Sequence, residues 1–118
     1  MLGTKQLSDV ALHEWVAQLY ATAISDCQEA KEHLAAGSDV LAYVAFLQAD
    51  NALTELINTL DVENDGDIAH MLQQYYQDIQ RHLRIANQNQ DAEEIQKVTK
   101  LLHQLAAIWQ HMGTMEAL

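Results

Sequence analysis

The stretch IQKVTKLLHQLAAIWQHM, residues 95–112, carries the clearest structural signal in the sequence. Its large apolar residues recur in alternating steps of three and four: Ile95, Val98, Leu102, Leu105, Trp109 and Met112. Such steps place side chains on one face of an α-helix. The stretch is therefore predicted to be a helix that buries this face against other parts of the chain.

Three earlier segments carry apolar stripes with the same spacing. These stripes are Leu12, Val16, Leu19, Ala23, Cys27, Ala30 and Leu34, then Phe46, Ala49, Leu53, Leu56 and Leu60, then Leu72, Tyr75, Ile79, Leu83 and Ala86. The breaks between segments are short: AGSD at 36–39, DVENDGD at 61–67 and NQNQD at 87–91. Breaks this short require consecutive helices to run antiparallel. The sequence predicts one all-α domain over residues 1–118, an antiparallel up-down-up-down four-helix bundle with helices at about 8–35, 39–60, 67–87 and 91–112.

The breaks also contain residues suited to helix ends. The residues predicted to end helices are Gly37, Gly66, and Asn87 or Asn89; those predicted to cap the next helix are Ser38 or Asp39, Asp67 and Asp91. Asp91 is followed three residues later by Glu94, which is the pattern of a capping box. We expect residues 1–7 and those after Gly113 to be loosely ordered.

Composition limits the function. The chain has 17 acidic and 6 basic residues, for a formal net charge of −11. This balance disfavours nucleic acids and anionic membrane surfaces as partners. The single Cys27 cannot form an internal disulfide, which is typical of a reducing cytosol. We find no signal peptide and no apolar run approaching the ~20 residues of a membrane span, so the protein is predicted to be cytoplasmic.

The sequence gives little evidence for a metal site or a catalytic site. The stretch DVENDGDIAHML, residues 61–72, resembles a calcium loop, but position 12 is Leu72 where a bidentate Glu is required. A di-iron centre needs Glu-x-x-His pairs, and the nearest approach is Asp67 with His70. Cys27 lies on the inward stripe of the first helix, where burial makes a thiol inert. The sequence therefore predicts no catalytic residue, no metal site and no cofactor.

Apolar residues beyond one stripe per helix are the remaining signal. Those outside the main stripes include Trp15, Tyr20 and Ile24 in the first helix, Leu41, Tyr43, Val44, Ala52 and Ile57 in the second, and Leu101 and Ile108 in the fourth. A second stripe can form a groove for another helix or a self-association surface. It can equally widen the core, and the two interpretations are evenly balanced.

The stretch YYQDIQRHLRIANQNQDAEEIQKVTKLLHQLAAIW, residues 75–109, resembles the flagellin-specific export chaperones, the FliS family. The matching residues are Tyr76, Arg81, Leu83, Ala86, Asn87, Asp91, Val98 and Trp109. The segments LYATAI at 19–24 and ADNALTEL at 49–56 are similar to the first two helices of that family. The resemblance extends from about Leu12 to Trp109.

This resemblance implies a cytosolic chaperone of flagellar type III export and no enzymatic activity. It implies binding to the disordered C-terminal segment of flagellin, which prevents premature polymerisation and keeps flagellin competent for export, with the flagellar export apparatus as a further partner. The residues expected to bind the client are Leu41, Val44, Ala52, Tyr76, Leu101 and Ile108.

Three alternatives remain open at this stage. The short N-terminal segment MLGTKQLSD lacks the tyrosines typical of the family, which leaves room for a divergent paralogue with another client. The second stripes could instead meet in a homodimer, making the protein a self-associating adaptor. A metal-binding bundle is the third and least supported alternative.

Overall fold

The computed structural model describes the backbone of residues 2–60 and 62–117 and the side chains of residues 11–60 and 66–111. Within these residues the chain forms four helices and no strand: α1 (Leu2–Ala35), α2 (Asp39–Asn58), α3 (Val62–Gln88) and α4 (Ala92–Ala117). The predicted all-α four-helix bundle is confirmed. The expectation of loose order at the two ends concerns residues whose side chains lie outside the described set.

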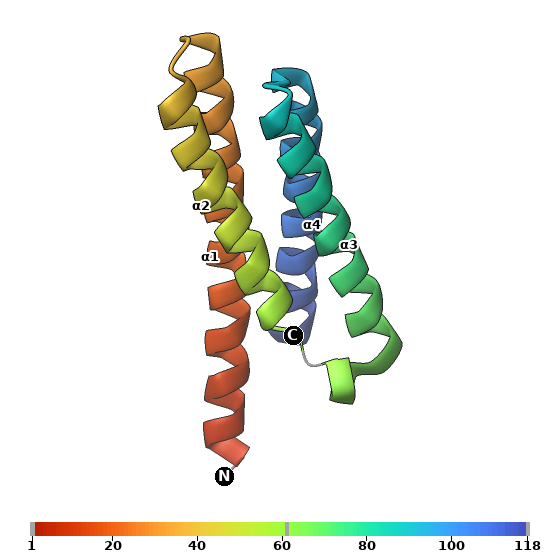
Figure 1. Cartoon of the computed structure of the whole chain (residues 1–118). Helices are drawn as coiled ribbons and strands as arrows, with labels where there is room; N and C mark the ends of the chain where they lie inside the picture. Colours follow the sequence, from red (N-terminus) through yellow and green to blue (C-terminus); the bar gives the residue numbers. More distant parts are fainter. Residues whose placement is uncertain (1, 61, 118) are drawn as a thin grey trace.

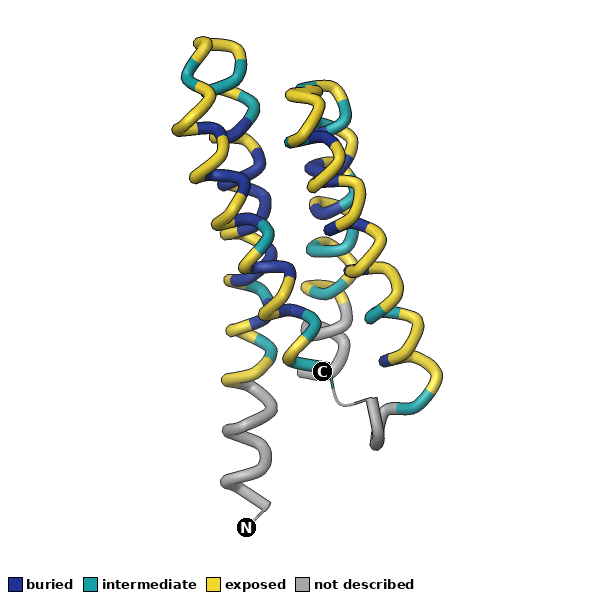
Figure 2. The backbone as a smooth tube through the Cα atoms, in the orientation of Figure 1, coloured by how far each residue is buried: buried dark blue, intermediate teal, exposed yellow. Residues whose placement is uncertain are grey.

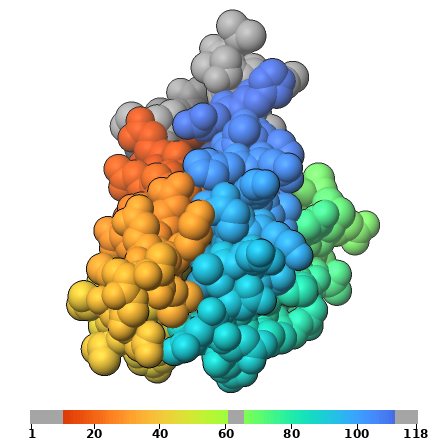
Figure 3. All heavy atoms as spheres, turned by 90° about the horizontal axis from the view of Figure 1, so that it is seen from above, coloured from red at the N-terminus to blue at the C-terminus, as the bar shows by residue number. Residues whose placement is uncertain are grey.

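The four helices form an elongated bundle with principal extents of 53 × 22 × 20 Å. Each helix packs against two others, in the pairs α1–α2, α2–α3, α3–α4 and α1–α4. In Figure 1 the chain climbs along α1, descends along α2, climbs along α3 and descends along α4. Figure 3 looks onto one end of the bundle, where the α1–α2 turn (yellow) lies beside the α3–α4 turn (cyan).

The turn between α1 and α2 is a Schellman motif centred on Gly37, which has φ +76°. The Gly37 N–H donates to the Leu34 carbonyl (3.1 Å), and the Ser38 N–H donates to the His33 carbonyl (2.8 Å). This pattern requires a left-handed residue, which glycine adopts without a steric penalty. Ser38 is the N-cap residue of α2, but its side chain makes no capping hydrogen bond, so the expected side-chain cap is wrong for this residue.

The turn between α3 and α4 repeats this motif with a residue other than glycine. Gln90 has φ +53°; its N–H donates to the Asn87 carbonyl (3.2 Å), and the Asp91 N–H donates to the Ala86 carbonyl (2.9 Å). The helix was expected to end at Asn87 or Asn89; α3 ends at Gln88, and the left-handed residue that follows is Gln90. The predicted cap at Asp91 is confirmed, because its Oδ1 accepts a hydrogen bond from the Glu94 N–H (3.2 Å).

Gly66 interrupts α3 near its beginning. Its φ and ψ of +63° and −132° are not helical, so the regular part of α3 starts after this glycine. Asp61, Glu63 and Asp65 of the calcium-like stretch lie outside the residues whose side chains are described. In the same stretch Leu72 is partly buried, whereas Ile68 is 66% exposed.

The core follows the predicted stripes, except that two expected residues are exposed and four unexpected ones are buried. Leu12 and Tyr75 were expected inside but are exposed, and Met112 lies outside the described side chains. Residues assigned to second stripes or to partner binding are buried instead: Tyr20, Ile24, Ala52 and Tyr76. Because each helix packs against two neighbours, one stripe is too narrow to describe its buried side (Figure 2).

Candidate functional site

Helix α2 presents exposed apolar side chains near its beginning. They are 40 to 76% exposed and form what we call the α2 face: Val40, Leu41, Tyr43, Val44 and Leu47. The opposite side of the same helical turns is buried through Ala42, Ala45 and Phe46. Contiguous exposed apolar side chains of this kind often mark an interaction surface.

Helix α2 is also long and apolar enough, over its 20 residues, to cross a membrane by length and composition. This finding corrects the expectation that no segment approaches such a length. Core helices of water-soluble proteins pass the same test, and α2 places Phe46, Leu53 and Leu56 in the core of the bundle.

A second apolar surface lies between α3 and α4. A groove of about 260 Å³ separates these helices, and we call it the α3–α4 groove. Its apolar lining comes from Tyr75 and Ile79 on α3 and from Val98 and Leu101 on α4. Tyr75 is half-exposed, so the groove opens to solvent along an apolar wall.

The apolar lining continues along both helices beyond the groove. On α3, Ile68 and Met71 precede Tyr75 in steps of three and four and are 66 and 55% exposed. On α4, Ile108 follows Leu101 by seven residues and is 57% exposed. These spacings keep the side chains on the same side of each helix as the groove lining. Figure 3 shows the beginning of the described part of α3 (green) projecting at the side of α4 (blue).

The rim of the α3–α4 groove is polar. His82 Nδ1 lies 3.6 Å from Glu94 Oε1, and Lys97 Nζ lies 3.7 Å from Glu94 Oε2. On α3, Arg81 pairs with Asp78 at 2.7 Å. Exposed pairs of this kind contribute little to stability. They can therefore rearrange at low cost.

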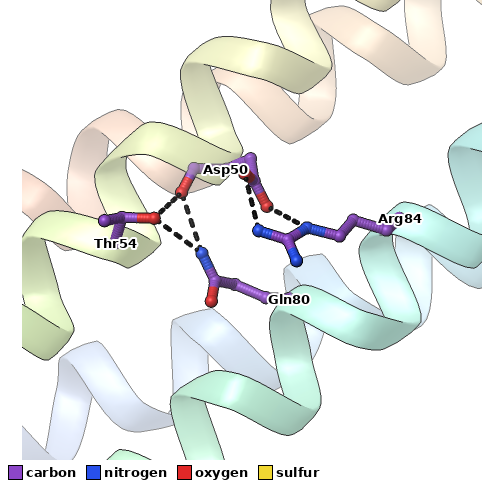
Figure 4. A network of polar contacts seen from close by, with 4 residues as sticks. All are labelled: Asp50, Thr54, Gln80 and Arg84. Carbon is purple, nitrogen blue, oxygen red and sulfur yellow. Dashed lines mark hydrogen bonds and ion pairs between the residues drawn. The ribbon is translucent and has the colours of Figure 1, made fainter.

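The α2–α3 interface is joined differently, by a polar network along its edge (Figure 4). Arg84 donates from Nε (3.0 Å) and Nη2 (3.1 Å) to the two carboxylate oxygens of Asp50. Gln80 Nε2 donates to the Asp50 carbonyl (3.2 Å) and to Thr54 Oγ1 (2.9 Å). A bidentate guanidinium–carboxylate pair fixes both helices in orientation. The network therefore ties α3 to α2 on the side away from the α3–α4 groove.

The six residues expected to bind a partner fall into three groups. Leu41 and Val44 belong to the α2 face, and Leu101 and Ile108 lie along the α3–α4 groove. Ala52 and Tyr76 are buried in the core.

The reason for the burial of Tyr76 is a contact with α1. The Tyr76 and Tyr20 hydroxyls form a hydrogen bond, and the two rings meet edge to face with centroids 6.2 Å apart. Burial raises the pKa of both phenols. Tyr76 is thus a structural residue that joins α3 to α1 across the middle of the bundle.

The sequence interpretation missed Val40, Leu47, Ile68 and Met71 as exposed apolar residues. Their signal was present in the sequence: Met71 lies four residues before Tyr75, and Leu47 lies three after Val44. What could not be read was the side of each helix that the other helices leave open.

The described residues show neither a reactive thiol nor a cluster of metal-ligating side chains. Burial raises the pKa of Cys27 to about 12, so this thiol stays protonated and shielded. In the part of the chain that the structure describes, no three His, Cys, Asp or Glu side chains gather as a metal site would require.

Comparisons with known proteins identify a family and a curated relative. A family of flagellar proteins, described as "Flagellar protein FliS", matches residues 4–116. The flagellar secretion chaperone FliS of Campylobacter jejuni subsp. jejuni is 29% identical over 102 residues. That match covers 86% of this chain and 79% of the Campylobacter protein.

Proposed function

This chain belongs to the FliS family of flagellar proteins, and we propose that it is a cytosolic secretion chaperone for the disordered C-terminal segment of flagellin. In this role it would prevent flagellin from polymerising early and keep flagellin competent for export. The chaperone class comes from the family. The choice of flagellin as client is our proposal, and it rests on the resemblance described above.

The observation that carries the proposal is the apolar surface that the bundle leaves uncovered. A disordered client loses conformational entropy on binding, so it needs a large apolar contact area to compensate. The α2 face and the α3–α4 groove supply two such areas on rigid helices. Amphipathic client segments could lay their apolar sides on both, as helices do in other hydrophobic grooves.

The contact residues in this proposal are Leu41 and Val44 on α2 with Leu101 and Ile108 on α4. Ala52 and Tyr76 act through the core that supports these helices, because they are only 5% and 2% exposed. Their replacement should alter stability before it alters affinity.

The proposal can be tested by titrating the purified chain with a peptide of the cognate flagellin C-terminus in a calorimeter. Wild-type protein should form a stoichiometric complex. Burying an isoleucine side chain contributes about 1.5–3 kcal/mol, so Ile108→Asp should weaken binding roughly tenfold to a hundredfold. Leu41→Asp should weaken it to a similar extent if the α2 face also contacts the client.

A matched control is available in Leu12→Asp, since Leu12 is 43% exposed on α1 and belongs to neither surface. This variant should bind the peptide like the wild type, and all three variants should retain their helical circular dichroism. Failure of the wild type to bind the peptide at micromolar concentrations would reject flagellin as the client. Wild-type affinity in both Ile108→Asp and Leu41→Asp would place the contact elsewhere.

Self-association is the second candidate, and the α2 face is the observation that favours it. Two copies could cover their exposed Leu41, Val44 and Leu47 against each other. Light scattering over a wide concentration range distinguishes the two ideas. A dimer that Leu47→Asp dissociates would support self-association, whereas a monomeric mass at every concentration would reject it.

A further inference from the structure

A separate groove lies between α1 and α2 and has a different chemical character. It has a volume of about 480 Å³. Its lining combines apolar side chains, Trp15, Leu19 and Ala52, with polar ones: Gln18, Thr22 and Asp26 on α1 and Gln48, Asn51 and Glu55 on α2. Two of these residues are acidic, and neither Lys nor Arg lines the groove.

Asp26 is the unusual member of this lining. Its side chain belongs to a residue that is only 9% exposed, which is rare for a carboxylate without a partner. No hydrogen bond or ion pair to its carboxylate is present among the described residues. Every fully enclosed polar atom of that part of the chain has a partner, so the Asp26 carboxylate oxygens reach solvent through the groove. Burial, and secondarily the nearby Glu29, raises its pKa.

A buried carboxylate without a counter-charge destabilises a protein, and it attracts any cation that can reach it. The Asp26 carboxylate lines an open groove, so a cationic side chain from another molecule could reach it. Glu55 adds a second negative charge to the lining. Trp15, 47% exposed, lines the same groove about 16 Å away along α1, where its ring can contact another part of the segment.

The groove is continuous with the α2 face. Leu41, Val44, Gln48, Asn51 and Glu55 follow one another in alternating steps of three and four, so they share one side of α2. A segment that lies on the exposed leucine and valine therefore leads directly into the acidic groove. This continuity connects the groove to one of the two proposed client surfaces.

We propose that the α1–α2 groove receives an arginine or lysine side chain of the client segment, which forms an ion pair with the Asp26 carboxylate. This inference rests on the proposed function and adds a requirement on the client: a basic residue beside its apolar stripe. Arginine suits the site better than lysine, because its planar guanidinium can pair with a carboxylate through two parallel hydrogen bonds.

The decisive variant is Asp26→Asn, which keeps the shape of the side chain and removes its charge. Loss of one partner of a buried ion pair should weaken binding of the cognate flagellin C-terminal peptide by about tenfold or more. The free protein should become more stable to heat, because the uncompensated buried charge is gone. If Asp26 had only a structural role, Asp26→Asn would instead lower the melting temperature of the free protein.

The partner residue can be found by changing each Arg and Lys of the peptide to Gln in turn. One of these peptides should bind about tenfold more weakly to the wild type and show no further loss with Asp26→Asn. Glu32→Gln is the control for the protein, because it makes the same change of charge at an exposed position of α1 outside the groove.

The outcomes separate this inference from the proposed function. Equal peptide affinity in the wild type and in Asp26→Asn overturns the ion pair and leaves the chaperone proposal standing. Equal losses of peptide affinity in Asp26→Asn and Glu32→Gln would show that only the net charge of the protein matters. That result would also overturn the ion pair. A wild-type protein that binds no flagellin peptide overturns both.

Discussion

Replacing Tyr76 by Phe should destabilise the folded protein more than the loss of one oxygen atom suggests. Tyr76 and Tyr20 are each 2% exposed, and their hydroxyl groups form a hydrogen bond with each other. Removing one hydroxyl leaves the other buried without a partner. Removing both leaves two phenylalanine rings in an apolar setting that suits them.

The magnitudes follow from this asymmetry. An unpaired buried hydroxyl costs about 1–3 kcal/mol, so Tyr76→Phe and Tyr20→Phe should each lower the free energy of unfolding by that amount. The double variant loses only the net value of one hydrogen bond, about 1 kcal/mol. Its destabilisation should therefore be well below the sum of the two single effects. For a chain of this size each kcal/mol corresponds to roughly 4 °C in melting temperature.

Urea denaturation of the four proteins of this double-mutant cycle, followed by circular dichroism, measures these values. Additive single effects would refute the reasoning, because they would show that the hydroxyls do not depend on each other. A second measurement is the affinity for the flagellin peptide. Tyr76→Phe should leave it unchanged, and a loss there would restore Tyr76 to the binding surface.

The same pair predicts a loss of stability in alkali. Burial holds the pKa of both phenols in the folded protein above the value of 10.0 expected for the unfolded chain. Between these values the folded state retains protons that the unfolded state releases, so the free energy of unfolding should fall as the pH rises above about 10. The fall should be smaller in the double variant, and an equal fall would show that other groups cause it.

Three further predictions concern single positions. Cys27, with its pKa raised to about 12 by burial, should react with a thiol reagent at pH 8 at least about a hundredfold more slowly in the native protein than in urea; equal rates would contradict its burial. Gln90 and Gly37 both have positive φ, which glycine adopts most easily. Gln90→Gly should therefore stabilise the protein by about 0.5–1 kcal/mol in thermal melts, and Gly37→Ala should destabilise it by about 1 kcal/mol. Stability changes of the same sign in both variants would contradict this account. Arg84→Ala should cost up to about 1 kcal/mol in low salt and less in high salt, more than Arg81→Ala, whose partner lies on the same helix.

The helices and their turns could be predicted because they depend on neighbours in the sequence. The stripe from Ile95 to Trp109 repeats over four turns, and the position of Asp91 before Glu94 indicates the start of α4. The left-handed residue in the same turn could not be predicted. Asn87 and Asn89 tolerate positive φ better than Gln90, but the register of the two helices places Gln90 at that position.

Burial was harder to predict where two adjacent residues both fit the spacing. Leu72 is followed at three and four residues by Tyr75 and Tyr76, and either choice leads on to Ile79. The structure buries Tyr76 because Tyr20 of α1 provides a partner for its hydroxyl. That partner is 56 residues away in the sequence, so only the packed bundle can decide between them.

The candidate surfaces were predictable in part for a related reason. Leu41, Val44, Leu101 and Ile108 follow from their positions beside the main stripes. Asp26 carries no signal in the sequence, because an aspartate beside a helical stripe is usually solvated. It becomes notable only when α1 and α2 close around it.

The two Schellman turns have a consequence for folding kinetics. Each joins its helices through three residues, 36–38 and 89–91, so α1–α2 and α3–α4 are hairpins whose contacts are local in the sequence. Local contacts favour fast folding. The chain also contains no proline, so refolding has no slow isomerisation step. Diluted from denaturant, the protein should therefore refold in one phase, within roughly milliseconds.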